Sequence, residues 1–359
     1  MRIFIRTDAS IQIGSGHVMR CLTLAKQLQK NNVVVKFVCR RLEGNMIDYI
    51  VDQGFEVFTL KEVVEISHWD WTKEHWLEDA KETISFVQLE QGKVDMLIVD
   101  HYSIDIQWEQ QLRSFVKKIM VIDDVADRKH DCDLLLDQNY YLNMEHRYKN
   151  LVSKNCIQFL GPNNALLREE FLNVNSTELI RDGSIKDILI FFGGSDSTGE
   201  TLKTLYALEK IIDKQIIFNV VIGSANPFKE QIQLFCNQYD NVKMHCNIDY
   251  MAKLMADADL AIGAGGTASW ERIYLRLPAI VTVLANNQLE LTEALSYAGT
   301  IQSIGESQNV KQSDIQHKLE SLISHPHEVR KMIKKCTSII DTSVVQENKL
   351  VSQIMEFMK

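Results

Sequence analysis

The stretch that decides the fold is Met1-Arg2-Ile3-Phe4-Ile5-Arg6-Thr7-Asp8-Ala9-Ser10-Ile11-Gln12-Ile13-Gly14-Ser15-Gly16-His17. Residues 2–6 alternate polar and apolar as in a β-strand, and residues 18–28 carry apolar side chains at the three-and-four spacing of a helix. Gly14 and Gly16 separate the two elements. Glycine lets a ligand approach the backbone, and the first turn of a helix offers N–H groups to an anion. The stretch therefore predicts a phosphate or diphosphate pocket.

His17 stands where this predicted helix begins. The positive end of the helix dipole disfavours a second positive charge and so favours a neutral imidazole that can accept a proton. A general base needs that property. A histidine that only hydrogen-bonds its own loop is an equally good interpretation of the position, so both remain open from position alone.

The sequence lacks the residues that accompany a glycine loop in other known motifs. A dinucleotide fingerprint needs a third glycine where Met19 stands, and an acidic residue after the next strand, which instead ends in Arg40-Arg41. NAD is therefore disfavoured, and NADP is only weakly supported. No Gly-Lys-Ser/Thr follows the loop, and no Gly-x-Ser-x-Gly elbow occurs in the chain.

Length and composition indicate an ordinary two-domain protein. The chain has 359 residues, 45% hydrophobic and 24% charged, with a formal net charge of −9. This charge gives no overall basic footprint for nucleic acid. We find no signal-peptide pattern and no apolar run of membrane-span length, and therefore expect a cytoplasmic protein without a membrane anchor.

The seven cysteines form no C-x-x-C pair, and several lie in apolar patterns, so we interpret them as buried hydrophobic residues rather than disulfides or zinc ligands. Six aspartates lie between Asp123 and Asp137, but their spacing matches no calcium loop, and we expect no metal site. Residues 67–76 hold three tryptophans and two histidines. Packing of the indoles is the favoured interpretation of this segment, and a ligand role remains open.

The apolar strand expected at residues 94–99 runs into Asp100-His101-Tyr102. Ligands gather at the carboxyl ends of parallel strands, so these residues are candidates for a site. Capping of the following helix is the favoured role of Asp100.

The second half of the chain repeats the order of strand, glycine turn and helix. A strand at 188–192 precedes Gly193-Gly194, and a strand near 258–263 precedes Gly265-Gly266-Thr267. Glu271 follows one turn into the next helix, where it could accept hydrogen bonds from ribose hydroxyls. A strand at 277–283 leads to Asn286-Asn287-Gln288, whose carboxamides suit sugar hydroxyl or amide groups. Two such half-chains predict two doubly wound Rossmann-like domains that face each other across a cleft.

Several segments together carry a resemblance to a known family. They are Arg6-Thr7-Asp8-Ala9-Ser10 with Ile13-Gly14-Ser15-Gly16-His17-Val18-Met19-Arg20, Asp100-His101-Tyr102, Asp123-Asp124 with Cys132-Asp133-Leu134-Leu135, Ala165-Leu166-Leu167-Arg168-Glu169-Glu170-Phe171, Phe192-Gly193-Gly194-Ser195-Asp196 and Asn287-Gln288. From residue 1 to about 300 the chain resembles the UDP-2,4-diacetamido-2,4,6-trideoxy-β-L-altropyranose hydrolases of pseudaminic acid biosynthesis, which have the GT-B fold. The related lipid I glycosyltransferase also has a glycine loop ending in histidine but lacks the Arg-x-Asp-Ala-Ser lead-in.

The resemblance implies a division of labour. Residues 173–187 are polar with little periodicity and mark a linker between residues 1–172 and residues 188–340. By the resemblance, the first domain would hold the sugar and the catalytic base His17, and the second would bind UDP. Residues 341–359 would form a C-terminal helix that returns to the first domain. The implied UDP site is the Gly265-Gly266-Thr267 loop. The residues expected to contact substrate are Asp8, Gly14, Gly16, Arg20, Tyr102, Gly194, Gly265, Gly266, Thr267, Glu271, Asn287 and Gln288.

The expected reaction is hydrolysis of the C1–O bond of the UDP-sugar with inversion, with no cofactor or metal, in a monomer. Two alternatives stay open. The first is a GT-B glycosyltransferase in which an acceptor hydroxyl replaces water. The second is a nucleotide-sugar binding module without catalysis.

Overall fold

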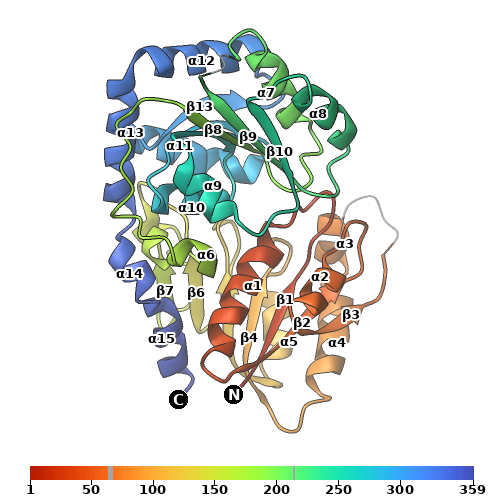
Figure 1. The fold of residues 1–359 in the computed structure, drawn as a ribbon. Coiled ribbons are helices and arrows are strands. Elements are labelled where there is room, and N and C mark those ends of the chain that lie inside the picture. The colour runs from red at the N-terminus through yellow and green to blue at the C-terminus, as the bar shows by residue number, and fades with distance from the viewer. Residues whose placement is uncertain (64–67, 213–214) are drawn as a thin grey trace. The chain divides into compact units, whose positions relative to one another are not determined.

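The computed structural model describes residues 1–63, 68–212 and 215–359, which form two compact units (Figure 1). The first unit consists of Met1–Asn139, Asn143–Leu166 and Glu347–Lys359, and the second of Tyr140–Leu142 and Leu167–Gln346. Each unit is built around its own parallel sheet.

The first unit holds a seven-stranded sheet in the order β3-β2-β1-β4-β5-β6-β7. Its strands are β1 (Arg2–Thr7), β2 (Val34–Arg40), β3 (Glu56–Leu60), β4 (Val94–Asp100), β5 (Val116–Ile122), β6 (Leu134–Asp137) and β7 (Ile157–Leu160). Its helices are α1 (Gly16–Gln29), α2 (Ile47–Asp52), α3 (His68–Glu74), α4 (Trp76–Val87), α5 (Ile106–Leu112), η1 (Met144–His146), η2 (Pro162–Asn164) and α15 (Lys349–Phe357).

Successive side chains of β1 point to opposite faces of this sheet, and both faces are buried. Ile3 and Ile5 share a core with α1, α2 and the final helix α15, whereas Phe4 faces the core that includes residues of α4 and α5. A parallel sheet covered on both faces is the arrangement that a doubly wound domain requires. In this way the last residues of the chain complete the core of the first unit.

The second unit repeats the plan with a six-stranded sheet in the order β10-β9-β8-β11-β12-β13. Its strands are β8 (Asp187–Phe191), β9 (Ile217–Ile222), β10 (Val242–Cys246), β11 (Leu260–Ala264), β12 (Ala279–Val283) and β13 (Ile301–Glu306). Its helices are α6 (Glu169–Leu172), α7 (Glu200–Leu208), α8 (Lys229–Cys236), α9 (Met251–Asp257), α10 (Ala268–Tyr274), η3 (Asn286–Gln288), α11 (Leu289–Ala298), α12 (Gln312–Ser324), α13 (Pro326–Ile339) and α14 (Thr342–Gln346).

In both sheets the strand order reverses beside the first strand of the unit. The chain moves outward from β1 to β3 and then returns to place β4 on the other side of β1, and β8 and β11 repeat this pattern. Ligands of doubly wound domains bind at such a reversal, at the carboxyl ends of the strands. The doubly wound fold expected from the sequence is confirmed, and each unit has a reversal at which a ligand can bind.

Asp100 and the segment 67–76 were both given a favoured role from the sequence. Asp100 does not cap the next helix, because that helix begins at Ile106 and Asp105 accepts the N–H of Gln107. Part of the Trp/His-rich segment 67–76 lies outside the described residues, so its role stays open.

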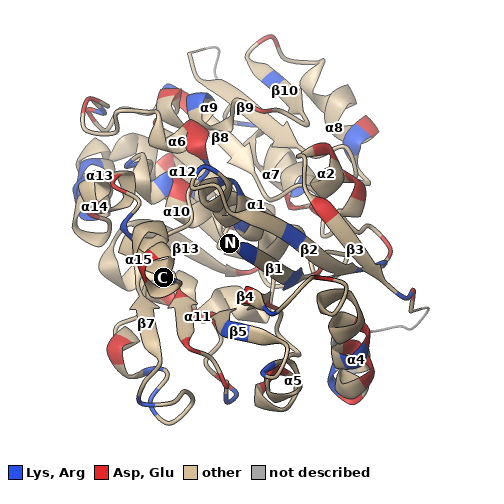
Figure 2. Ribbon diagram, turned by 90° about the horizontal axis from the view of Figure 1, so that it is seen from below, with Lys and Arg blue, Asp and Glu red and all other residues tan. Residues whose placement is uncertain are grey.

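Acidic and basic residues are intermingled over the ribbons of both units (Figure 2). Within the described residues, no helix has the length and apolar character needed to span a membrane.

Candidate active site

His17 and Asp100 meet at the strand-order reversal of the first unit. His17 is the second residue of α1, directly after the loop that follows β1, and Asp100 is the last residue of the adjacent strand β4. Nδ1 of His17 lies 2.6 Å from Oδ1 of Asp100, and both side chains are buried. Neighbouring parallel strands thus bring together two residues that are 83 positions apart.

Arg20, one turn further along α1, binds both oxygens of the Asp100 carboxylate. Its Nε and one terminal nitrogen each lie 2.6 Å from Asp100, and its other terminal nitrogen lies 2.6 Å from Oδ2 of Asp124. Burial alone would raise the pKa of Asp100, but Arg20 and then His17 hold it well below its usual range. Asp100 is therefore a buried carboxylate that stays ionised.

This contact determines where His17 carries its proton. An ionised carboxylate only accepts hydrogen bonds, so Nδ1 of His17 is the donor to Asp100. In the neutral ring the lone pair then resides on Nε2. A carboxylate in this position orients the ring and stabilises the imidazolium that forms when Nε2 takes a proton. The arrangement fits a general base.

The other first-unit residues named from the sequence divide into two groups. Tyr102 packs edge-on against the His17 ring, with ring centroids 4.5 Å apart. Gly14 has a φ of +77°, which favours glycine, and its N–H donates to Ser10 in the turn that leads to Gly16 and α1. The structure thus groups Gly14, Gly16, Arg20 and Tyr102 around His17.

Asp8 is buried in the interior, where its Oδ2 lies 3.4 Å from Nε2 of His101, the residue between Asp100 and Tyr102. Its carboxylate forms an ion pair with Arg6 at 2.7 Å and accepts the backbone N–H of Arg40. Both arginines also bind Asp79, and all four residues are buried. Any effect of Asp8 on a ligand would therefore act through the support it gives to the ends of β1 and β2.

In the second unit the glycine loop follows β11. Gly265 is packed against α11, because a Cβ built there would lie 2.2 Å from Oγ1 of Thr292. A Cβ at Gly266 would lie 3.8 Å from Nε2 of Gln288, which follows β12. Thr267 is exposed and precedes α10. The structure thus brings Gln288 beside the loop, as the neighbouring positions of β11 and β12 require.

Three further predicted residues surround this edge of the second sheet. Asn287 is exposed in η3. Gly194 follows β8, and its carbonyl accepts the N–H of Gly223, which joins the loops after β8 and β9. Glu271 of α10 accepts a hydrogen bond at 2.8 Å from Nε of Arg168, so one of its carboxylate oxygens is already engaged.

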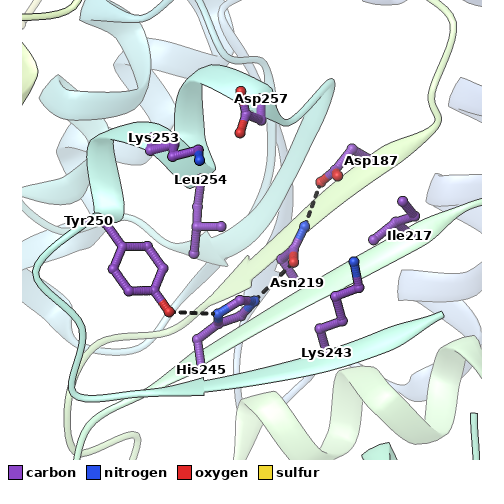
Figure 3. A pocket seen from close by; sticks show the side chains of 9 residues that line it. All are labelled: Asp187, Ile217, Asn219, Lys243, His245, Tyr250, Lys253, Leu254 and Asp257. Carbon is purple, nitrogen blue, oxygen red and sulfur yellow. Dashed lines mark hydrogen bonds between the residues drawn. The ribbon is translucent and has the colours of Figure 1, made fainter. Parts of the chain in front are cut away.

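A separate pocket of about 540 Å³ lies beside α9 and the strands β8, β9 and β10 (Figure 3). In it Tyr250, His245, Asn219 and Asp187 form one hydrogen-bonded chain. Several of its lining residues lie near the amino ends of their strands, away from the glycine loops, and the residues predicted from sequence do not line it. In the described part of the chain, no cluster of three or more His, Cys, Asp or Glu side chains could hold a metal ion.

Sequence reasoning named Asp100 as a site candidate but favoured a capping role for it, and it assigned no role at this site to Asp124. Asp100 ends β4 and Asp124 follows β5, and these strand-end positions were the available signal. A strand-end aspartate is also a common helix cap. Choosing between the two roles requires knowing that β4 lies beside β1.

Comparisons with known proteins agree with this architecture. Residues 188–353 match the Glycosyltransferase family 28 C-terminal domain. The chain is 30% identical over 279 residues to the UDP-2,4-diacetamido-2,4,6-trideoxy-beta-L-altropyranose hydrolase of Campylobacter jejuni, a match covering 77% of this chain and 89% of that protein. It is also 30% identical over 298 residues to an uncharacterised protein of Methanocaldococcus jannaschii, covering 81% of this chain, and spans 57% of that protein's length.

Solved glycosyltransferase structures share the fold along the whole chain. MurG of Acinetobacter baumannii superposes with a TM-score of 0.64 at 14% identity, covering 98% of this chain and 99% of that one. The spinosyn rhamnosyltransferase SpnG gives 0.68 at 12% identity, covering 99% and 100%. At these identities the likeness establishes the GT-B fold.

Proposed function

Because the chain belongs to the family of the UDP-2,4-diacetamido-2,4,6-trideoxy-beta-L-altropyranose hydrolase, we propose that it hydrolyses a UDP-linked diacetamido-trideoxy sugar to free sugar and UDP. The observation that supports this proposal most is the 2.6 Å contact between His17 Nδ1 and the ionised Asp100, which leaves the Nε2 lone pair to act as a base.

In the proposed reaction Nε2 of His17 takes a proton from a water molecule as its oxygen attacks C1 of the sugar. The bond between C1 and the diphosphate oxygen breaks, and UDP leaves with the bonding electrons. Attack from the face opposite UDP inverts the anomeric centre. Asp100 stabilises the imidazolium through Nδ1, and Arg20 holds Asp100 in place.

The loops of the second unit are proposed to hold UDP. The diphosphate is proposed to approach the backbone at Gly265 and Gly266. Gln288 beside Gly266 and Glu271 in the first turn of α10 are proposed to contact the nucleoside. The leaving group's charge would then be stabilised by backbone and side-chain donors.

A GT-B glycosyltransferase is the second candidate, because the matching domain is named for glycosyltransferase family 28 and the structural neighbour SpnG is named a rhamnosyltransferase. Proton NMR of the anomeric signal, with the UDP-sugar and without acceptor, separates the two candidates. Release of the sugar in the inverted configuration supports the hydrolase. Turnover only after an acceptor is added supports the transferase.

The role of His17 is tested in the same assay. We expect His17→Ala to lose roughly 10²–10⁴-fold in turnover, the usual contribution of general-base catalysis, while UDP affinity stays unchanged. His146→Ala is the matched control, because His146 is an exposed histidine of the same unit in η1. Near-normal turnover by His17→Ala would show that another group is the base.

A further inference from the structure

Arg272 of α10 is a buried cation directly behind the Gly265 loop. One terminal nitrogen donates to the carbonyl of Ala264 at 2.8 Å and to Oγ of Ser269 at 2.9 Å. The side chain is only 3% exposed. Gly263 makes room for it, because a Cβ there would lie 3.1 Å from the other terminal nitrogen.

No carboxylate among the described residues forms an ion pair with Arg272, and its Nε has no hydrogen-bond partner there. The adjacent Glu271 is bound to Arg168. Burial lowers the pKa of Arg272 to about 10, which leaves it cationic near neutral pH. The charge of Glu271 favours the cationic form of Arg272, but Glu271 forms its ion pair with Arg168. Buried charges in proteins are normally paired, so a buried cation without an ion pair to a described carboxylate needs an explanation.

Arg181 of the same unit offers an instructive contrast. It also lacks an ion pair with a described carboxylate, but its nitrogens donate to four carbonyls, those of Met255, Ala256, Ala258 and Leu275. These acceptors lie at the ends of α9 and α10, where carbonyl groups carry partial negative charge. These four carbonyl groups stabilise the buried charge of Arg181, which joins the ends of α9 and α10. Arg272 donates to one carbonyl and one hydroxyl, so its charge is stabilised by fewer acceptors.

The Ala264 carbonyl links Arg272 to the loop. In a trans peptide the C=O of Ala264 and the N–H of Gly265 point in opposite directions, so a cation on the oxygen polarises the N–H on the other side. The polarised donor belongs to the loop that the proposed function assigns to the diphosphate.

We propose that Arg272 acts as a positioning residue that makes the Gly265 loop selective for a highly charged phosphoryl ligand, through the Ala264–Gly265 peptide and its own buried charge. This inference rests on the proposed function, since the ligand class is the diphosphate of a nucleoside diphosphate. The bound anion supplies a counter-charge near Arg272, which forms no ion pair with any carboxylate among the described residues.

Titration calorimetry at fixed ionic strength tests the inference with UDP, UMP and uridine. Loss of one charge-strengthened hydrogen bond lowers affinity roughly tenfold, so Arg272→Met should bind UDP about tenfold more weakly than the wild type. Its affinity for UMP should fall by a smaller factor, and its affinity for uridine should not change. Arg272→Lys keeps the charge and should retain most of the UDP affinity. Arg181→Met is the matched control, which should lower the melting temperature without changing UDP affinity.

The outcomes separate the inference from the proposed function. If UDP and uridine are weakened by the same factor, or if Arg272→Met binds UDP as the wild type does, the inference is overturned and the UDP site stands. Wild-type protein that binds no UDP would overturn both. If circular dichroism shows that Arg272→Met is unfolded, Arg272→Gln, which can still donate to Ser269, replaces it under the same criteria.

Discussion

The pairing of Asp100 with His17 leads to a quantitative prediction for Asp100→Asn. At an effective dielectric constant of about 20, Coulomb's law gives roughly 6 kcal/mol for the attraction between the carboxylate and an imidazolium at 2.6 Å. It gives roughly 5 kcal/mol for the repulsion between that imidazolium and the Arg20 nitrogen 3.2 Å from Nδ1. In the wild type the two nearly cancel.

An asparagine at position 100 removes the attraction and leaves the repulsion. Charge delocalisation in all three groups reduces both values, so we expect kcat to fall by about 10²–10⁴, the range that general-base catalysis supplies. The loops proposed to hold UDP belong to the other unit, so UDP affinity should not change. The assay is acceptor-free release of UDP from the UDP-sugar, with calorimetry of UDP on the same preparation.

Glu109→Gln is the matched control for Asp100→Asn. Glu109 is also buried and lies 2.6 Å from Nδ1 of a histidine, His130, in the same unit. This variant should lose stability and keep the kcat of the folded protein. If Asp100→Asn folds and turns over like the wild type, or if both variants lose kcat equally, Asp100 has no specific role in activating His17.

Three further predictions concern packing and pH. Gly265→Ala should cost about 1–3 kcal/mol in UDP binding or stability, because its Cβ would meet Oγ1 of Thr292, and Thr292→Ala in the same chain should recover the loss; calorimetry that finds no recovery would refute the clash. Burial raises the pKa of Asp137 to about 7, so the folded chain retains a proton that the unfolded chain releases near pH 4, and stability should fall as pH rises from about 4 to 7. Asp137→Asn should flatten that part of the melting profile, and an unchanged profile would contradict the assignment. At Asp79 burial opposes ionisation but two arginines lower the pKa to about 2, so its contribution should be present above pH 4 and lost as pH falls toward 2; an Asp79→Asn variant with the same acid unfolding curve as wild type would disprove it.

Local sequence signals predicted the elements of the fold well. The strand expected at 188–192 is β8, shifted by one residue, and the strand expected at 94–99 is β4 with one residue added. Periodicity and flanking glycines are properties of neighbouring residues, so they are readable without the fold. Boundaries were less exact, as in β12, which begins at Ala279 although a strand was expected from residue 277.

The candidate site was less predictable. Arg20 was expected to contact substrate, and the structure engages it with Asp100 and Asp124. Asp8 was expected beside it and lies in the interior with Arg6. A charged residue near a glycine loop looks the same in the sequence whether it contacts a ligand or a buried partner. The reason is that the partner is distant in the chain, as Asp100 and Asp124 are from Arg20.

The sequence by itself determined the two series of strands and helices, the glycine loops that end their first strands, and His17 as a candidate base, because each depends on residues adjacent in the chain. Only the tertiary structure decided that Asp100 is the partner of His17 and that Arg272 is buried without an ion pair to a described carboxylate. Both depend on which strands are neighbours and on what surrounds a buried side chain. Burial makes such contacts energetically decisive, and the sheet order that creates them is set by the packing of the whole domain.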